Sequence, residues 1–232
     1  MKILSIDTAS NICSVSILEN NHVLIEKNIE NQKTHSERLM PMIQEVLQET
    51  NLTLNNMDLF AVSKGPGSFT GIRIGISTIK AFSDALSIPA LGITSLEGLA
   101  YNVDTDGLIA VLLDAKNNNV YYGLFRKQGD TYTPIGSFLA EPITTILPLL
   151  TSFSEKIIFL GDGSMIHQEL IHTTVKENAI FMSEDKSKAK ASNIGKAAYY
   201  HYTNHCTETC ILSPLYLKKS QAERALEESH GN

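Results

Sequence analysis

The stretch that decides the fold is Gly65-Pro-Gly-Ser-Phe-Thr-Gly71, which runs directly into Ile72-Arg-Ile-Gly-Ile-Ser-Thr-Ile-Lys80. Three glycines and a proline let the chain turn tightly, and the apolar pattern that follows predicts a helix over residues 72–86. Ser68 or Thr70 can cap this helix. Because a helix N-terminus offers unpaired N–H groups and a partial positive charge, such a loop is typical of a phosphate site.

The rest of the chain divides into short apolar runs and a few amphipathic stretches. Thr34 and Glu37 fit a capping box ahead of a helix that includes residues 39–47. Alternation and apolar runs predict the remaining strands and helices. We expect strands at 2–6, 13–17, 23–29, 58–63, 90–93, 108–114, 120–126, 131–139 and 156–160, helices at 143–150 and 192–202, and an extended segment at 212–218.

The second half of the chain repeats the order of the first. Residues 2–6 form an apolar run that ends in Asp7, and residues 108–113 form one that ends in Asp114. The strand at 156–160 leads into Gly161-Asp-Gly-Ser164, the counterpart of the Gly65 loop. Duplicated units of this kind predict a two-lobed α/β protein. Chance repetition is the alternative, because strands often end in Asp or Gly.

The division that follows is an N-terminal lobe over residues 1–106, a C-terminal lobe over 107–219 and a mobile tail over 220–232, where apolar residues are few. The N-terminal lobe carries the glycine-rich loop and its helix.

Composition limits the setting and the partners. The chain has 232 residues, a formal net charge of −6 and only three cysteines, so we expect a cytoplasmic protein without disulfides. No apolar run reaches the roughly 18 residues of a membrane span. An acidic chain lacks the clustered cations that hold a phosphate backbone, so any contact with RNA should depend on other proteins.

Several motifs in the same order carry a resemblance to a known family. Besides the Gly65 loop with Arg73, they are Ile6-Asp-Thr8, Leu113-Asp-Ala115 ahead of Val120-Tyr121, and Pro214-Leu-Tyr-Leu-Lys218. Together they resemble the TsaB family, formerly YeaZ, almost from end to end. The resemblance implies the fold of actin, Hsp70 and sugar kinases, which is a duplicated two-lobed α/β architecture.

The resemblance also implies a function and a set of partners. The family acts in making N6-threonylcarbamoyladenosine in tRNAs that read codons beginning with A. It implies a heterodimer with TsaD, which carries the transfer chemistry, and a larger complex with the ATPase TsaE, while TsaC supplies the threonylcarbamoyl adenylate. A self-dimer in the absence of TsaD, and contact with tRNA only through the complex, complete the expectation.

Catalytic residues are hard to find in this chain. TsaD-type proteins carry a His-x-x-x-His pair on a helix after the strand that here is 90–93, whereas this chain has Ser95 and Leu99 at the matching positions. Serine is a poor metal ligand and leucine is none. We therefore expect no catalytic residue and no metal at this place.

The sequence also lacks part of the glycine-rich turns that a nucleotide site of this fold would need. Asp7, Thr8, Gly161 and Gly163 are vestigial candidates for a nucleotide site in the cleft between the lobes. A glycine-rich turn at the end of the first strand of each lobe would let backbone N–H groups approach phosphates, but Ala9 and Ala115 stand there instead. We expect no bound cofactor, and a nucleotide at a subunit boundary stays open.

A second candidate metal site combines His201, His205, Cys206 and Cys210, which form two pairs with a spacing of four. On a continuous helix, positions 205 and 206 lie about 100° apart, so the two pairs would occupy two faces. A structural role is the preferred interpretation.

The helix after the glycine-rich loop has an apolar arc of roughly 220°, wider than the roughly 100° needed to pack on one sheet. The excess predicts a second neighbour. One alternative is internal, namely the helix around residues 39–47, and the family resemblance favours a subunit interface. The predicted partner interface comprises Leu39, Ile43, Ile72, Arg73, Ile76 and Ile79.

Three functions therefore compete. The first is a non-catalytic subunit that stabilises and activates TsaD. The second is an enzyme of the same fold, either an ATP-dependent kinase or a metallopeptidase-like protein. The third is a plain dimeric binding module.

Overall fold

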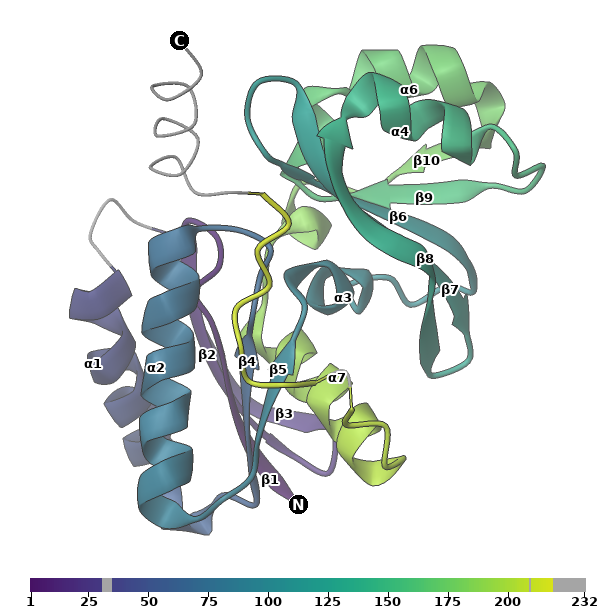
Figure 1. Cartoon of the computed structure of the whole chain (residues 1–232). Coiled ribbons are helices and arrows are strands. Elements are labelled where there is room, and N and C mark those ends of the chain that lie inside the picture. The colour runs from purple at the N-terminus through teal and green to yellow at the C-terminus, as the bar shows by residue number, and fades with distance from the viewer. Residues whose placement is uncertain (31–34, 209, 219–232) are drawn as a thin grey trace, which may run out of the picture.

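The computed structural model describes residues 1–30, 35–208 and 210–218. Thr34 of the predicted capping box and the predicted mobile tail at 220–232 lie outside the described residues. Two five-stranded sheets, each with helices on both faces, form two lobes (Figure 1). The strands and helices are β1 (Lys2–Asp7), β2 (Ile12–Glu19), β3 (His22–Glu30), α1 (His35–Glu49), β4 (Leu59–Ser63), α2 (Phe69–Leu86), β5 (Ala90–Ile93), α3 (Ser95–Ala100), β6 (Gly107–Asp114), β7 (Asn119–Gln128), β8 (Thr131–Pro142), α4 (Ile143–Leu150), β9 (Ile157–Leu160), α5 (Asp162–Ile166), α6 (Gln168–Val175), β10 (Ala179–Phe181) and α7 (Ala191–Thr203), with short 3₁₀ turns at Leu54–Asn56, Lys176–Asn178 and Asp185–Ser187.

The two sheets have the same topology. Their strand orders are β3-β2-β1-β4-β5 and β8-β7-β6-β9-β10, which correspond strand for strand. In each, the first three strands form an antiparallel meander, and the fourth and fifth add in parallel on the other side of the first. The predicted duplication of a two-lobed α/β unit is confirmed. Asp7 and Asp114 are the last residues of the corresponding strands β1 and β6.

Helix α1 and helix α2 lie side by side on one face of the N-terminal sheet (Figure 1). The apolar spacing of α1 places four side chains on one buried stripe. Helix α2 begins at Phe69, three residues earlier than predicted, because the hydroxyl of Ser68 accepts a hydrogen bond from the Gly71 N–H at 3.2 Å. The core between these helices and the sheet includes Leu4, Ile6, Leu39, Met42, Ile43, Val46, Phe60, Val62, Ile72, Ile76 and Ile79.

In each unit, the α-helix that follows the fifth strand covers the sheet of the other unit. Helix α7, which follows the last strand of the C-terminal sheet, packs on β1, β2 and β4 of the N-terminal sheet. Helix α3, which follows the last strand of the N-terminal sheet, packs on β6 and β7. Ile194, Ala197 and Ala198 of α7 share one apolar cluster with N-terminal strands. The sequence boundary at 106/107 therefore does not separate two independent packing units.

The segment after α7 returns along the N-terminal lobe. The Gly92 N–H of β5 donates to the Cys210 carbonyl at 2.9 Å, and the Leu215 N–H donates to the Lys64 carbonyl at 2.8 Å. Lys218 Nζ donates to the Ala115 carbonyl of the C-terminal lobe at 2.9 Å. Residues 211–218 form no regular strand, but they connect the edge of one sheet with the other lobe.

Candidate functional site

Asp7 ends β1 with its carboxyl buried in the protein. The residue is 2% exposed, and the Ala9 N–H donates to Asp7 Oδ1 at 2.9 Å. Burial raises the pKa of the carboxyl to about 6, although hydrogen bonds from Ala9 and Ser63 act in the opposite direction. Asp7 can therefore take up or release a proton near neutral pH, which an exposed aspartate does not do.

Thr8 holds the glycine-rich loop against the end of β1. Its hydroxyl donates to the Gly71 carbonyl at 2.8 Å, and the Ser68 N–H donates to the Ala9 carbonyl at 2.7 Å. A Cβ on Gly71 would lie 1.9 Å from the Thr8 carbonyl oxygen, so only glycine fits there. The N–H groups of Ser68 and Gly71 already have acceptors within the chain. These contacts support the interpretation of the loop as a turn that starts α2.

Gly161 and Gly163 repeat this arrangement in the C-terminal lobe. Gly161 has a φ of 95°, and a Cβ there would lie 2.2 Å from the Leu112 carbonyl oxygen of β6. The Gly163 N–H donates to Asp162 Oδ1 at 2.9 Å. In both lobes, a glycine-containing loop after the fourth strand packs on the end of the first strand. This packing requirement accounts for the glycines without a ligand.

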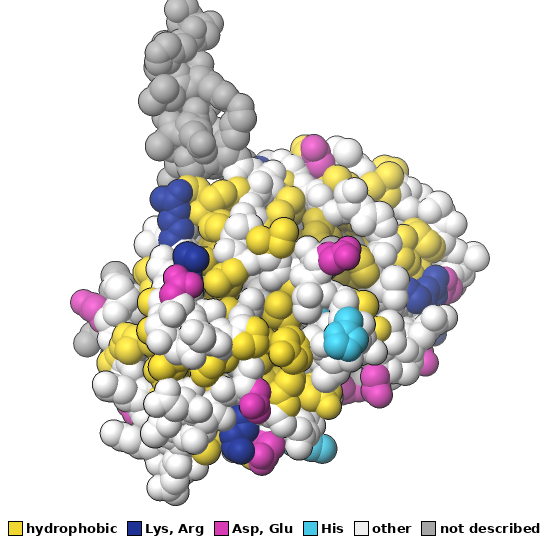
Figure 2. Space-filling view, turned by 60° about the horizontal axis from the view of Figure 1, so that its bottom comes forward, with side chains coloured by type: hydrophobic (Ala, Val, Ile, Leu, Met, Phe, Trp, Pro, Cys, Tyr) yellow, Lys and Arg dark blue, Asp and Glu magenta, His cyan; other side chains and the backbone are white. Residues whose placement is uncertain are grey.

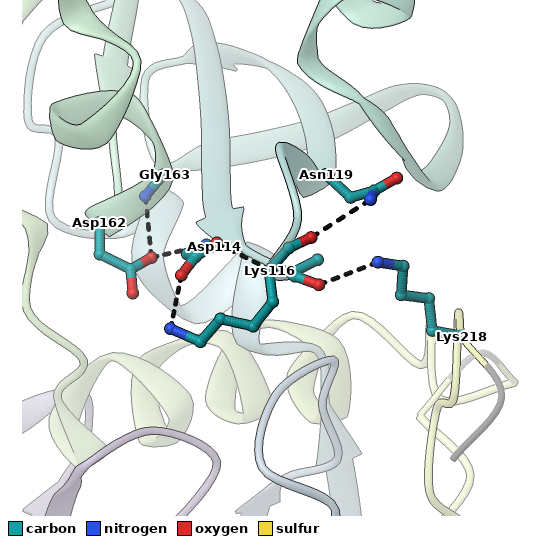
Figure 3. Close-up of polar contacts among 7 residues, drawn as sticks. Asp114, Lys116, Asn119, Asp162, Gly163 and Lys218 are labelled. Carbon is teal, nitrogen blue, oxygen red and sulfur yellow. Dashed lines mark hydrogen bonds and ion pairs between the residues drawn. The ribbon is translucent and has the colours of Figure 1, made fainter. Parts of the chain in front are cut away.

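Asp114 is tied to the loops around it (Figure 3). Its N–H donates to Asp162 Oδ1 at 2.9 Å, and its carboxylate accepts from the Lys116 N–H at 2.8 Å and from Lys116 Nζ at 2.7 Å. Burial raises the pKa of Asp114, but the hydrogen bonds and charge of Lys116 outweigh it and hold the pKa below its usual value. A carboxylate therefore stands where a phosphate would have to approach.

The turn between β6 and β7 has an unusual backbone. Lys116, Asn117 and Asn118 have φ values of 62°, 56° and 58°, which places three successive residues in the left-handed region. The Asn119 side chain donates to the Lys116 carbonyl at 3.2 Å and to the Asn117 carbonyl at 2.9 Å. Such residues cost free energy and persist where surrounding contacts fix them. Figure 3 shows how Lys218 reaches this turn from the end of the described chain.

Helix α3 has internal partners at both positions where TsaD-type proteins are expected to carry histidine. Ser95 Oγ and Ser63 Oγ lie 2.8 Å apart, and Leu99 is a core residue between α3 and the C-terminal sheet. Within the ranges that the structure describes, no group of three or more His, Cys, Asp or Glu side chains could hold a metal ion.

Helix α7 ends at Thr203, close to the predicted end at residue 202, so His205, Cys206 and Cys210 lie beyond the helix that holds His201. His201 instead lies between two acceptors, Glu97 Oε1 at 2.6 Å from Nε2 and the Cys206 carbonyl at 3.1 Å from Nδ1. Two acceptors require two N–H groups, so the ring is an imidazolium. Burial lowers the pKa of His201, but hydrogen bonds with Cys210 and Glu97 raise it to about 10. Sequence periodicity gave no signal for this ion pair, whose members lie 104 residues apart.

The predicted interface residues separate into two groups. Leu39, Ile43, Ile72, Ile76 and Ile79 are all buried in the core between α1, α2 and the sheet. Arg73 alone is exposed. The wide apolar arc of α2 is used within the chain, on the sheet and on α1, so any partner of this helix pair must contact other side chains.

The outer face of the helix pair combines apolar and small side chains with charged ones, among them Lys80 and Asp84. Met40 of α1 is 43% exposed, and Ser77, Ala81 and Ala85 of α2 are exposed as well. Figure 2 shows one face of the molecule, on which apolar side chains gather across the middle while charged side chains stand singly or in small groups. The described residues contain no helix long and apolar enough to span a membrane.

Of the N-terminal candidates, Thr8 thus contacts the Gly65 loop and Asp7 contacts Ala9 and Ser63. The C-terminal candidates Gly161 and Gly163 contact the end of β6. Among the described residues, no hydrogen bond joins the two groups. The hydrogen bond from Lys218 to the Ala115 carbonyl was not predicted from the sequence, because a local sequence pattern does not show which part of the fold a later segment will contact.

Comparison with known proteins gives consistent matches. A family model described as TsaD, tRNA N6-adenosine threonylcarbamoyltransferase, matches residues 23–226. The tRNA threonylcarbamoyladenosine biosynthesis protein TsaB of Bacillus subtilis (strain 168) is 28% identical over 230 residues, covering 99% of each chain. The protein of the same name from Buchnera aphidicola subsp. Schizaphis graminum is 29% identical over 202 residues, which cover 81% of this chain and 96% of its own.

Solved structures show the same fold. A Pseudomonas aeruginosa protein described as similar to peptidase YEAZ superposes with a TM-score of 0.80 at 24% identity, over 94% of this chain and 99% of that one. A putative N-acetylmannosamine kinase from Listeria monocytogenes superposes with a TM-score of 0.52 at 10% identity, over 88% and 99% of the two chains. The architecture is the duplicated two-lobed α/β fold of the actin, Hsp70 and sugar-kinase class.

Proposed function

This chain belongs to the TsaD family of tRNA N6-adenosine threonylcarbamoyltransferase proteins and, within it, to the TsaB (YeaZ) group, and we propose that it is the non-catalytic subunit that stabilises and activates TsaD. It takes part in the biosynthesis of threonylcarbamoyladenosine in tRNA. In the proposed complex TsaD performs the transfer, TsaE joins as the ATPase, and tRNA is contacted through the assembly. The setting is the cytoplasm.

The observation that supports the proposal is that helix α3 has no metal-binding side chain at the two positions where TsaD-type proteins are expected to carry histidine. The hydroxyl of Ser95 is paired with Ser63, and Leu99 is buried in the core. Neither position offers a ligand for a metal that would activate a carbonyl or a phosphoryl group. The transfer chemistry is therefore assigned to the partner.

The cleft supports the same assignment. The N–H groups of Ser68 and Gly71 are used within the chain, and Asp114 with Lys116 occupies the turn of the C-terminal lobe. An approaching phosphate would meet the negative charge of Asp114. We propose no cofactor for the isolated chain, and a nucleotide at the boundary with another subunit stays compatible with this arrangement.

We propose the outer face of α1 and α2 as the surface that contacts TsaD, and a second copy of this chain when TsaD is absent. The face displays the exposed apolar side chains of Met40 and Ala81 beside charged residues, and the surfaces that proteins cover in complexes combine an apolar centre with a polar rim. The buried isoleucines of α2 act indirectly, by fixing the helix on its sheet.

The test is reconstitution of tRNA modification from purified TsaC, TsaD and TsaE with and without this chain. The expected result is threonylcarbamoyladenosine, detected by mass spectrometry of digested tRNA, only when the chain is present. Equal product without the chain, or product from the chain without TsaD, would overturn the proposal.

The second candidate is an enzyme of the same fold, favoured by the retained Asp7 with its raised pKa. ATP binding by the isolated chain, measured by calorimetry and lost in Asp7→Ala, would support a kinase. Stoichiometric zinc or iron in the purified protein would support a metallopeptidase. Neither result is expected of a non-catalytic subunit.

A further inference from the structure

Arg73 is held in a fixed position on the surface of α2. Its guanidinium carbon lies 4.0 Å from the centre of the Phe69 ring, and its Nε donates to Tyr216 Oη at 2.9 Å. The rings of Phe69 and Tyr216 stack with centroids 4.4 Å apart and planes 21° from parallel. One face and one edge of the guanidinium are therefore engaged by side chains from two distant segments.

The two Nη nitrogens of the Arg73 guanidinium are able to donate hydrogen bonds to a further ligand. Among the described residues, the Nη atoms of Arg73 take part in no hydrogen bond or ion pair. Their N–H groups form a planar fork that matches a carboxylate or a phosphate. Because Nε is already bonded to Tyr216, only this end-on geometry is open to a further ligand.

The surroundings favour a carboxylate of a protein over the phosphates of a nucleic acid. The nearest turns of α2 expose Ser77 and Ala81, and Lys80 is paired with Asp84 at 3.6 Å. A phosphate backbone needs several clustered cations, whereas helix α2 exposes two, Arg73 and the paired Lys80. A single fixed arginine with aromatic neighbours is typical of the few side chains that dominate a protein interface.

We propose that Arg73 binds an Asp or Glu carboxylate of the TsaD-type partner, and that Tyr216 is a positioning residue that holds the guanidinium for it. The inference rests on the proposed function and adds the ligand chemistry of the interface. It also makes residues 211–218 part of that interface, because Tyr216 aligns the arginine from the C-terminal segment.

Pre-organisation is the physical reason for this arrangement. An arginine side chain on a helix surface otherwise loses considerable rotational freedom when it forms an ion pair. Stacking on Phe69 and the bond to Tyr216 remove most of that freedom before the partner arrives. The fork then forms its two hydrogen bonds at a smaller entropic cost.

The experiment measures the dissociation constant of the full chain with TsaD by calorimetry. Arg73→Gln should weaken binding roughly thirtyfold or more, because a partner carboxylate is left buried and unpaired. Arg73→Lys keeps the charge but not the fork, and should fall between Arg73→Gln and the parent. Lys156→Gln removes one exposed positive charge from the other lobe and should stay within about twofold of the parent.

Tyr216→Phe tests positioning, because it keeps the stacked ring and removes only the acceptor of the Arg73 bond. We expect binding to weaken by roughly three- to tenfold, and this loss should disappear when Arg73 is already glutamine. Equal losses in both backgrounds would contradict the positioning role.

The outcomes separate the proposals. If the parent chain does not bind TsaD, the proposed function fails. If the parent binds and Arg73→Gln binds equally well, with an unchanged melting temperature, the carboxylate anchor alone is wrong. Retained TsaD binding together with weaker tRNA binding by the assembled complex would overturn the anchor in favour of a phosphate contact.

Discussion

The backbone N–H of Ser192 donates a hydrogen bond of 2.7 Å to Glu26 Oε1, so a carboxylate from β3 caps the first turn of α7. The preceding N–H, of Ala191, donates to Ser14 Oγ of β2 at 2.7 Å. The N-cap residue Lys190 itself forms no side-chain cap. The start of the last helix is therefore satisfied by the lobe on which that helix packs.

Removing this cap should loosen the attachment of α7. We expect Glu26→Ala to lower the free energy of unfolding by about 0.5–2 kcal/mol, because the N-terminus of α7 loses an acceptor and a favourable charge. The measurement is urea unfolding. Glu45→Ala is the control, because Glu45 is exposed and its partner Lys27 keeps a second ion pair with Glu49. Equal losses in the two variants would contradict the capping role.

The ion pair of His201 and Glu97 should make stability depend on pH. The pKa of His201 is about 10 in the folded chain and near 6.5 when unfolded, so the pairing stabilises fully below pH 6.5. That contribution should decline steadily as pH rises from about 6.5 to 10. Unfolding experiments on the parent and on His201→Gln should show a difference that shrinks across this range. A difference independent of pH would show that the ring is neutral in the folded state.

Asp7 should also make stability fall as pH rises, because it is a buried acid that weakens the fold when it ionises. Its folded pKa of about 6 exceeds the unfolded 3.8, so its stabilising contribution is complete below about pH 3.8 and lost as pH rises through 6. Asp7→Asn cannot ionise and can still accept from Ala9. We expect its advantage over the parent in the free energy of unfolding to grow from less than about 1 kcal/mol at pH 4 to about 3 kcal/mol at pH 7. Asp84→Asn, at an exposed position, should show no such gain.

Gly71 should tolerate no side chain. In Gly71→Ala the new Cβ would lie 1.9 Å from the Thr8 carbonyl oxygen, and neither backbone can move freely. We expect a loss of about 3 kcal/mol or more in the free energy of unfolding. Thr70→Ala, the exposed neighbour, should lose less than about 1 kcal/mol. A mild effect at Gly71 would mean that the loop and the β1 turn separate readily.

The proposed partner face can be tested without disturbing the core. Ala81 lies at the centre of the exposed face of α2, so Ala81→Arg should leave the melting temperature unchanged while weakening association with TsaD by roughly tenfold or more. Thr173→Arg places the same side chain on the exposed surface of α6. Equal binding by both variants would place the interface elsewhere.

The repeated order of strands and helices could be predicted from the sequence, because the same strand-ending and turn residues recur in each lobe. Two local sequence signals occur once in each lobe. One is a buried strand that ends in aspartate, at Asp7 and at Asp114, and the other is a strand that leads into a glycine-containing loop. The start of α2 was set three residues too late, since the cap by Ser68 extends the helix through Phe69 and Thr70.

The use of the apolar surface of α2 could not be predicted in the same way. Ile72, Ile76 and Ile79 are apolar, but periodicity does not say whether the second neighbour is α1 or another subunit. Within the chain that neighbour is α1, whose Leu39 and Ile43 fill the same core. The ion pair of Glu97 with His201 could not be predicted from the sequence either, because it depends on a tertiary contact between helices of different units.

Because α3 and α7 each cover the sheet of the other unit, the N-terminal sheet can be completed only late in synthesis. The sheet that ends with β5 at Ile93 acquires one of its covers only when α7 emerges from Ala191 onward. At ribosomal speeds of 5–20 residues per second, that interval lasts roughly 5–20 s. Until then an apolar face that includes Leu18 and Leu59 has no helix over it and stays exposed on the growing chain.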